Sequence, residues 1–231
     1  MNLLSVDTTS REMTVALSKQ GGVFSKTKSI GLNNYENIIS LIENLLKRAA
    51  LKISQIDILG VCVGPGSFTG IRIGLSTLKA LAYANNIPIV EFKSLDLDAS
   101  MIKERFGLLC VMRDARRNNV YTALYSKNRA INRISNYSLC SVSEALNKLK
   151  KIAKSKKSLS FYGDAVYCYD TDIKRVFPDA KILLKKNNQY KANAMISMVR
   201  DNTRKKFNAF TIKPFYMYPR DCQVRKTKKI K

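Results

Sequence analysis

The sequence predicts an α/β fold in which mixed sheets are flanked by helices. Residues 3–6, 13–18 and 23–28 are short runs of strand-forming residues separated by polar or glycine turns, which is typical of a β-meander. Residues 35–50 place their apolar side chains along one side of a helix. Residues 56–63 form a continuous apolar run that ends at a glycine, which is typical of a strand buried on both faces. A meander followed by alternating helices and strands indicates an α/β lobe.

The rest of the chain continues this alternation. Ser67 or Thr69 can cap the helix that follows the glycine. Ser141, three residues before Glu144, has the spacing of a capping box that opens another helix. The remaining expected elements are helices at 68–85, 95–105, 141–154, 166–177 and 192–202, and strands at 87–92, 107–113, 120–125, 132–139, 159–162 and 181–184.

The chain is expected to form two lobes. Residues 1–106 are expected to form the first lobe, and residues 107–205 a second, basic lobe. Residues 206–231 are expected to form a final segment with a basic tail. Because the sequence contains neither a Gly/Ser linker nor a repeat, we expect the two lobes to touch extensively.

The two halves of the chain carry very different charge. The net charge is +24, with 12 Lys and Arg against 9 Asp and Glu in residues 1–110, and 29 against 8 in residues 111–231. A basic second half is suited to contact with nucleic acid. The alternative is a Lys-, Asn- and Ile-rich composition inherited from a biased genome. Such bias should affect both halves, so it explains the asymmetry poorly.

Composition also limits the compartment and the chemistry. The start of the chain lacks the features of a signal peptide, and no apolar run approaches the ~18 residues of a membrane span. The five cysteines are odd in number, far apart and outside Cys-x-x-Cys pairs, so they indicate neither a disulfide framework nor a zinc site. We therefore expect a cytoplasmic protein. The absence of histidine excludes a Ser-His-Asp triad, a Cys-His pair and a histidine-ligated metal.

Two segments have the composition of phosphate-binding turns. Asp7-Thr8-Thr9 can place a carboxylate near a metal–phosphate complex, although a plain structural turn is the favoured alternative. The run Gly64-Pro-Gly-Ser-Phe-Thr-Gly-Ile-Arg-Ile-Gly74 permits close backbone approach and offers hydroxyls at a helix N-terminus. It lacks the Gly-Lys-Ser/Thr of a Walker P-loop. An anion site and a tight strand–helix junction both fit it.

The helices expected at 35–50 and 68–85 carry more apolar or small residues than a single core stripe needs. On the second helix, Ile73, Thr77, Ala80 and Ala84 lie opposite the core stripe. A third layer of secondary structure within the lobe can cover these additional apolar residues. Contact with another protein is the other explanation.

The glycine run, with the valine before it and the leucine after it, resembles the signature of the TsaB (YeaZ-like) family. Further elements occur in the same order as in the family. They are Asp7-Thr8-Thr9-Ser10, Phe92-Lys-Ser-Leu95, Asp114-Ala-Arg-Arg117 before Val120-Tyr121, and Pro214-Phe-Tyr-Met217. The resemblance spans about residues 1–220 and is most specific in the first lobe.

The resemblance implies a two-lobed actin-like ATPase (ribonuclease H-like) fold with a degenerate nucleotide-binding apparatus. Proteins of the family act with TsaD and TsaE in forming N6-threonylcarbamoyladenosine at position 37 of tRNAs that read ANN codons. TsaD carries the metal and transfers the threonylcarbamoyl group, so no intrinsic catalysis, metal or cofactor is expected of this chain. ATP or ADP is then expected at the complex with TsaD and TsaE.

The resemblance also implies two sets of site residues. The residues expected to bind the partner are Ile39, Ile42, Leu46, Ile73, Thr77, Ala80 and Ala84. The residues of the degenerate phosphate-loop motif are Asp7, Thr8, Gly64, Gly66, Ser67, Thr69 and Gly70.

Several alternatives stay open from the sequence. One is an ATP-dependent small-molecule kinase of the sugar-kinase type, and another is a basic RNA-binding module. Arg116 and Arg117 are candidates for contact with tRNA phosphates, although a polar turn between strands is the favoured explanation for them. A homodimer is plausible when TsaD is absent.

Overall fold

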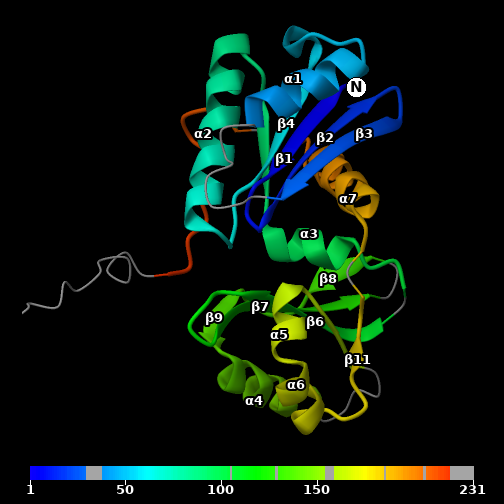
Figure 1. The fold of residues 1–231 in the computed structure, drawn as a ribbon, viewed down its shortest axis with the longest axis vertical. Helices are drawn as coiled ribbons and strands as arrows, with labels where there is room; N and C mark the ends of the chain where they lie inside the picture. The colour runs from blue at the N-terminus through cyan, green and yellow to red at the C-terminus, as the bar shows by residue number, and fades with distance from the viewer. Residues whose placement is uncertain are drawn as a thin grey trace, which may run out of the picture.

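The computed structural model describes residues 1–29, 38–104, 106–127, 130–153, 159–184, 186–204 and 207–218. It contains two β-sheets, one above the other, with a helical layer between them (Figure 1). Both sheets are mixed and both are flanked by helices, so the predicted α/β fold class is confirmed.

The first sheet has the strand order β3-β2-β1-β4-β5. Strands β1 (Leu3–Asp7), β2 (Glu12–Lys19) and β3 (Gly22–Ser29) form the predicted antiparallel meander. Strands β4 (Ile58–Cys62) and β5 (Ile89–Phe92) continue the sheet in parallel with β1. All side chains of β1 and β4 are buried, because helices cover both faces of the sheet.

The second sheet repeats this topology, with the order β8-β7-β6-β10-β11. As in the first sheet, three antiparallel strands are followed by two parallel ones. A further strand, β9, pairs with the start of β7. The strands are β6 (Phe106–Asp114), β7 (Asn119–Lys127), β8 (Ile131–Arg133), β9 (Ser138–Ser141), β10 (Leu159–Tyr162) and β11 (Lys181–Ile182).

The single strand predicted at residues 132–139 is wrong. The structure has two strands there, β8 and β9, which pair with opposite ends of β7. The break falls at Ser135, whose hydroxyl accepts the Leu124 N–H of β7 at 2.9 Å in place of a strand carbonyl.

The helices form three layers around the sheets (Figure 1). Helices α1 (Ile38–Arg48) and α2 (Phe68–Asn85) cover the outer face of the first sheet, and a short 3-10 helix spans Ile53–Gln55. Helix α7 (Asn188–Asp201) lies on its inner face, and α3 (Ser94–Ser100) packs against α7 and against the second sheet. The outer face of the second sheet is covered by α4 (Val142–Ala153), α5 (Asp164–Cys168) and α6 (Asp170–Val176).

The expected boundary of the second lobe needs a correction. Helix α7 falls within residues 107–205, yet it packs against β1, β2 and β3 of the first sheet. Phe207 then pairs with Ile89 of β5 through two backbone hydrogen bonds of 2.8 and 3.1 Å. The chain therefore returns to the first lobe because α7 supplies the apolar cover that the inner face of this sheet requires.

One hydrophobic core joins the two lobes. It contains Leu3 and Val90 from the first sheet, Leu109 and Val111 from the second, and Leu97 from α3 between them. Burial of these side chains away from water stabilises the arrangement of the lobes. Among the described residues, no helix is long and apolar enough to cross a membrane.

Candidate functional site

The glycine motif packs directly against the turn that follows β1. A Cβ atom on Gly66 would lie 2.2 Å from the Thr9 carbonyl oxygen, and one on Gly70 would lie 1.9 Å from the Thr8 carbonyl oxygen. The Thr8 hydroxyl donates to the Gly70 carbonyl at 2.6 Å, and the Ser67 N–H donates to the Thr9 carbonyl at 2.8 Å. The space beside these glycines is therefore filled by the Thr8–Thr9 segment and does not fit a phosphate group.

The motif also starts helix α2. Gly64 has φ = +110°, which favours glycine, and a Cβ atom there would meet Ile71 and Phe215. The Ser67 hydroxyl accepts the Gly70 N–H at 3.2 Å and caps the helix. Thr69, the other predicted cap, is exposed in the first turn.

Asp7 ends β1 and is fully buried. Its Oδ1 accepts the Thr9 N–H at 2.9 Å and the Thr9 hydroxyl at 2.7 Å. Its Oδ2 lies 2.8 Å from the Nζ of Lys191 on α7, a side chain that is itself almost buried. The carboxylate is thus held by a turn on one side and by an internal cation on the other.

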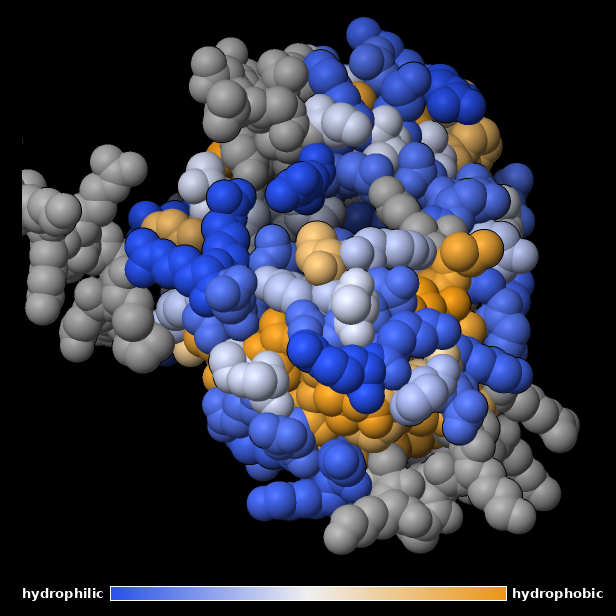
Figure 2. Space-filling view, turned by 60° about the horizontal axis from the view of Figure 1, so that its bottom comes forward, coloured by the Kyte–Doolittle hydropathy of each residue, from blue (hydrophilic) through white to orange (hydrophobic). Residues whose placement is uncertain are grey.

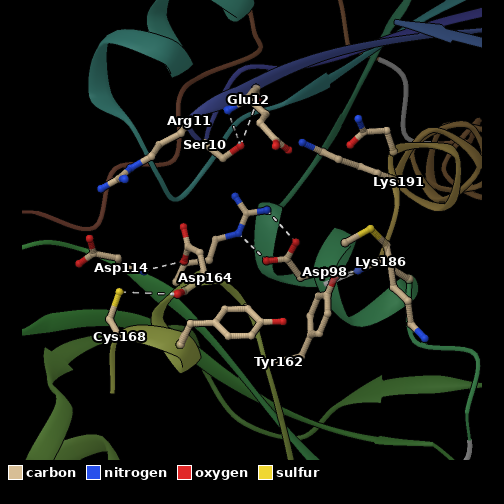
Figure 3. Close-up of a pocket in the computed structure, with 15 residues that line it drawn as sticks. Ser10, Arg11, Glu12, Asp98, Asp114, Tyr162, Asp164, Cys168, Lys186 and Lys191 are labelled. Carbon is tan, nitrogen blue, oxygen red and sulfur yellow. Dashed lines mark hydrogen bonds and ion pairs between the residues drawn. The ribbon is translucent and has the colours of Figure 1, made fainter. Parts of the chain in front are cut away.

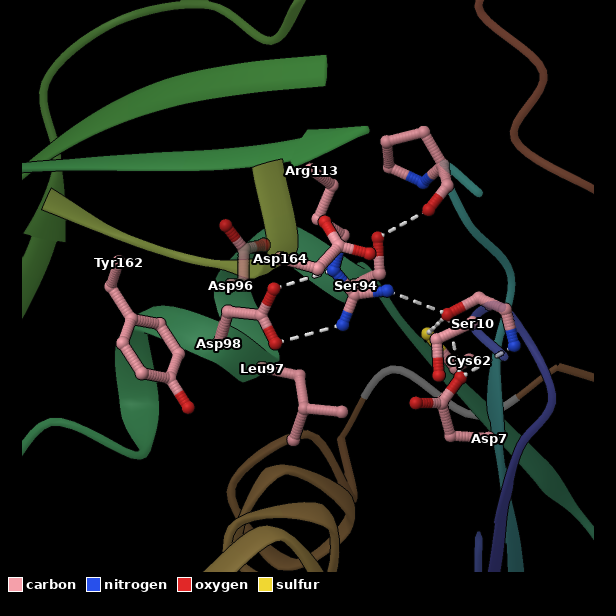
Figure 4. Close-up of polar contacts among 12 residues, drawn as sticks. Asp7, Ser10, Cys62, Ser94, Asp96, Leu97, Asp98, Arg113, Tyr162 and Asp164 are labelled. Carbon is pink, nitrogen blue, oxygen red and sulfur yellow. Dashed lines mark hydrogen bonds and ion pairs between the residues drawn. The ribbon is translucent and has the colours of Figure 1, made fainter. Parts of the chain in front are cut away.

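Arg113, at the end of β6, links the second sheet to this turn. Its Nε and Nη2 donate to the two carboxylate oxygens of Asp98 on α3, at 2.5 and 2.8 Å (Figure 4). Its Nη1 donates to the Thr9 hydroxyl at 2.8 Å. Asp98, Arg113, Thr9, Asp7 and Lys191 therefore form one buried polar chain, which we call the interlobe cluster. It contains two carboxylates and two cations, so its charges balance.

The interlobe cluster shifts the pKa values of Asp7 and Arg113. Burial alone would raise the pKa of Asp7, but the charges of Lys191 and Arg113 outweigh it and hold this pKa well below its usual range. Burial likewise opposes the charge of Arg113, and the carboxylate of Asp98 outweighs it and raises the pKa of the guanidinium. Both groups stay ionised throughout the physiological range.

The lowered pKa of Asp7 predicts acid sensitivity. Because the folded protein holds Asp7 ionised more strongly than the unfolded chain does, this group stabilises the fold above the usual Asp pKa of about 3.9. That stabilisation is lost as the pH falls below about 4. Urea denaturation between pH 6 and pH 3 should show a steeper loss of unfolding free energy for the parent chain than for Asp7→Asn. The exposed Asp179→Asn is the matched control, and an Asp7→Asn variant with the parent slope would contradict this assignment.

A cavity of about 330 Å³ lies beside the interlobe cluster (Figure 3). Side chains from the β1–β2 turn, α3, the ends of β6 and β10, α5 and the start of α7 surround it. Its residues are Ser10, Arg11, Glu12, Asp98, Met101, Arg113, Asp114, Tyr162, Gly163, Asp164, Tyr167, Cys168, Lys186, Asn188 and Lys191.

The charges around this cavity are mostly engaged within the protein. Lys186 pairs with Glu104 at 2.5 Å, and the Asp114 N–H donates to Asp164 at 2.9 Å. Lys191 and Arg113 belong to the interlobe cluster. Within the described part of the chain, no three His, Cys, Asp or Glu side chains are grouped as ligands for a metal ion.

Sequence reasoning missed three members of the interlobe cluster, namely Asp98, Arg113 and Lys191. In the sequence, Arg113 is a charged residue at the end of a predicted apolar strand, and Lys191 is the residue before a predicted helix. A charged residue at the end of a buried strand is a weak signal, because it does not indicate the partner.

The chain is similar to known proteins of one family. The family model described as TsaD, tRNA N6-adenosine threonylcarbamoyltransferase, matches residues 8–222. The Bacillus subtilis tRNA threonylcarbamoyladenosine biosynthesis protein TsaB is 32% identical over 126 residues, which are 54% of this chain and 55% of the relative. The Escherichia coli TsaB is 29% identical over 129 residues, 55% of this chain and 56% of the relative. The chain belongs to the TsaD family, as a TsaB (YeaZ-like) member.

The match to these two curated relatives spans little more than half of their length. Solved structures cover more of the chain and show the fold. YeaZ from Pseudomonas aeruginosa has a TM-score of 0.76 at 19% identity, covering 94% of this chain and 99% of that one. Another structure from this organism, described as an uncharacterised protein with similarity to peptidase YEAZ, has a TM-score of 0.77 at 21% identity with the same coverage. The sequence-based resemblance to the TsaB (YeaZ-like) family is confirmed.

The residues predicted to bind a partner divide into two groups. On α2, Ala80 and Ala84 are exposed, while Ile73 and Thr77 are half-buried beside them. Ile39 of α1 is exposed as well. We call the four residues of α2, together with Tyr83 of the same helix and Phe210, the α2 face. Tyr83 and Phe210 are 70% and 72% exposed, and their rings meet edge-on at 5.4 Å.

Ile42 and Leu46 do not belong to this face, and their prediction as partner-binding residues is corrected. They are only 2% and 8% exposed, and both lie in the core between α1 and the first sheet. Helix α1 turns its apolar stripe toward β2 and β3, so these side chains stabilise the lobe. The expected start of this helix at residue 35 lies outside the described residues.

Arg116 and Arg117 lie on the exposed turn between β6 and β7. Sixteen of the 29 basic residues in the second half fall within the described part of the chain, and the others lie outside it. Figure 2 views the end of the second lobe and shows hydrophilic side chains over most of that face, around an apolar area.

Proposed function

We propose that this chain is a non-catalytic partner of TsaD that acts with TsaE in the cytoplasm. Together they form N6-threonylcarbamoyladenosine at position 37 of tRNAs that read ANN codons. Family membership and the role for which the relatives are named support this proposal. In this proposal the second, basic half of the chain contacts tRNA, and ATP or ADP binds where the chain meets TsaD and TsaE.

The observation that carries the non-catalytic role is the pairing of Asp7 with Lys191 at 2.8 Å. A sugar-kinase type of reaction needs this carboxylate free to face a metal–phosphate complex. Here a side chain of the same protein neutralises it, and Thr8 and Thr9 fill the space beside the glycines. The carboxylate therefore has a structural partner instead of a metal ion.

The α2 face supports the partner role. Its exposed rings and small side chains form an apolar surface on the outside of the first lobe (Figure 1), and small residues on a helix let another helix approach closely. We propose that helices of TsaD pack there. A second copy of this chain takes the same place in a homodimer when TsaD is absent.

Reconstitution of the tRNA modification tests the function. Purified TsaD and TsaE are mixed with TsaC, which makes the threonylcarbamoyl adenylate, and with tRNA, threonine, bicarbonate and Mg-ATP. They should form the modified nucleoside only when this chain is present. Titration calorimetry of the chain alone with Mg-ATP should show no binding. Modification at the same rate without the chain would overturn the proposal, and tight Mg-ATP binding with phosphotransfer would favour the kinase alternative.

Charge placed on the α2 face should separate the chain from its partner. Ala80→Glu with Ala84→Glu is expected to weaken association with TsaD by at least about 100-fold, because two carboxylates would lose water in an apolar interface. Ser143→Glu with Asn147→Glu on α4 adds the same charge at the same spacing on another exposed helix and should leave association unchanged. Equal binding by both double variants in sedimentation or calorimetry would exclude this face.

A further inference from the structure

Residues 207–218, the last that the structure describes, run beside α2 and are drawn in orange and red in Figure 1. We call them the strap. The Phe210 ring meets the Tyr83 ring near the C-terminal end of α2, with centres 5.4 Å apart. The Tyr216 ring lies 4.7 Å from the ring of Phe68, the first residue of the helix. The strap is therefore antiparallel to α2 and contacts both of its ends.

The strap is anchored on the first lobe. Ile212 is only 1% exposed and belongs to the core on the outer face of the first sheet. Its carbonyl accepts a hydrogen bond of 3.3 Å from the Nζ of Lys79 on α2. The Phe215 N–H donates to the carbonyl of Val63 at 2.8 Å, just before the glycine motif. These contacts hold the strap on the first lobe as far as Phe215.

The end of the strap contacts the second lobe. The Tyr218 hydroxyl donates to the Ala115 carbonyl at 2.8 Å, and its ring meets the ring of Tyr121 edge-on at 6.1 Å. The Phe215 ring meets the ring of Tyr137 at 5.3 Å. Tyr218 also packs against the hydrophobic core that joins the two lobes. One short segment therefore connects α2 to the second sheet.

The turn that the strap reaches, between β6 and β7, has an unfavourable backbone conformation. Three consecutive residues after Ala115 have positive φ values, namely +64° at Arg116, +51° at Arg117 and +58° at Asn118. This left-handed region costs non-glycine residues free energy. The bond from Tyr218 to the Ala115 carbonyl is one of the contacts that hold the turn. Release of the strap should therefore let the turn open more often.

The strap also contributes to the surface around α2. Phe210, which belongs to the α2 face, is 72% exposed, and Tyr216 is 37% exposed. The Nε of Arg72 on α2 donates to the Tyr216 hydroxyl at 3.2 Å, and its guanidinium lies 3.8 Å from the centre of the Phe68 ring. A protein that covers α2 and these two rings binds more tightly when the strap is docked than when it is released.

We propose that the strap couples the α2 face to the second lobe. The chain alternates between the docked state described above and a state in which residues 213–218 leave the second lobe. A protein partner on the α2 face favours the docked state, because it buries Phe210 and Tyr216. Docking of the strap in turn raises the affinity for that partner by the same factor. That the partner is TsaD rests on the proposed function, whereas the coupling within the chain does not.

Hydrogen exchange of the isolated full chain tests the coupling without a partner. Arg72→Met removes the bond to the strap at the end of α2. It should speed amide exchange at residues 115–122 by about two- to tenfold, the range expected from the loss of one hydrogen bond. Tyr218→Phe removes the bond at the other end and should speed exchange of the Phe215 amide by a similar factor. Arg48→Met removes an exposed arginine from α1 and is the control.

Partner binding tests the same coupling from the α2 face. TsaD is expected to slow exchange at residues 115–122 of the parent chain, although these residues belong to the second lobe. Tyr218→Ala should abolish this slowing and weaken association with TsaD by at least about fivefold. Tyr167→Ala removes an exposed tyrosine from α5 of the same lobe and should change neither measurement. Tyr218→Phe, which keeps the ring, should have an intermediate effect, and thermal unfolding shows that each variant is folded.

The outcomes separate this inference from the proposed function. Unchanged exchange at one end of the strap after the bond at the other end is removed would overturn the coupling, as would an equal increase from Arg48→Met. Slowing by TsaD that is confined to α2 and the strap, together with parent-like affinity of Tyr218→Ala, would also overturn it and leave the proposed function intact. If the isolated chain shows the coupling but TsaD does not associate, only the proposed function fails.

Discussion

Replacing Arg113 by methionine is expected to lower the free energy of unfolding by about 3–5 kcal/mol. The change removes the cation that pairs with Asp98 at 2.5 and 2.8 Å and donates to Thr9 at 2.8 Å, while Asp98 stays buried. A buried carboxylate without its partner is strongly destabilising. Urea denaturation followed by circular dichroism measures the loss.

Two variants control this prediction. Arg175→Met removes an arginine from an exposed pair with Asp172 and should cost less than about 1 kcal/mol. Adding Asp98→Asn to Arg113→Met should recover part of the stability, because the uncompensated charge is then removed. A loss below about 1 kcal/mol for Arg113→Met would show that the interlobe cluster does not stabilise the fold.

Replacing Gly70 by alanine is expected to destabilise the protein by about 2–3 kcal/mol, although alanine favours helices. The helix preference for alanine is worth about 1 kcal/mol. The new Cβ atom would lie 1.9 Å from the Thr8 carbonyl oxygen, so the β1–β2 turn must move away from α2. Overpacking of this kind destabilises the protein by more than the helix preference of alanine stabilises it. Urea denaturation again gives the change in unfolding free energy.

Gly74 provides a sharper comparison. A Cβ atom there would lie 2.3 Å from the Thr8 side-chain hydroxyl oxygen instead of from a backbone atom. Gly74→Ala should therefore cost less in a Thr8→Ala background, whereas Gly70→Ala should cost the same in both backgrounds. Gly22→Ala, with its nearest atom at 3.4 Å, should be nearly neutral. A neutral Gly70→Ala would contradict the tight junction between α2 and the turn.

The sequence predicted most of the elements, because hydrophobic spacing is a local signal. The meander of β1, β2 and β3 and the strand–glycine–helix order around α2 were predicted within one or two residues. The prediction was wrong where local pattern and long-range packing disagree. Residues 132–139 contain the strand-forming Ile134 and Tyr137, but a side-chain bond from Ser135 divides the segment between them. Ile42 and Leu46 are part of an apolar arc too broad to show which edge faces the core.

Spacing within the sequence by itself determined the α/β fold class and the strand–glycine–helix order, and the motif determined the family resemblance. These depend on side-chain direction over a few residues, which helix and strand periodicity fix. The tertiary structure alone decided that Lys191 neutralises Asp7, that Arg113 reaches Thr9 from 104 positions away, and that the Tyr218 hydroxyl donates to the Ala115 carbonyl 103 positions away. It also showed that the two sheets repeat one topology without a sequence repeat. The partner of a buried charge depends on which elements pack together, and local spacing carries no information about that choice.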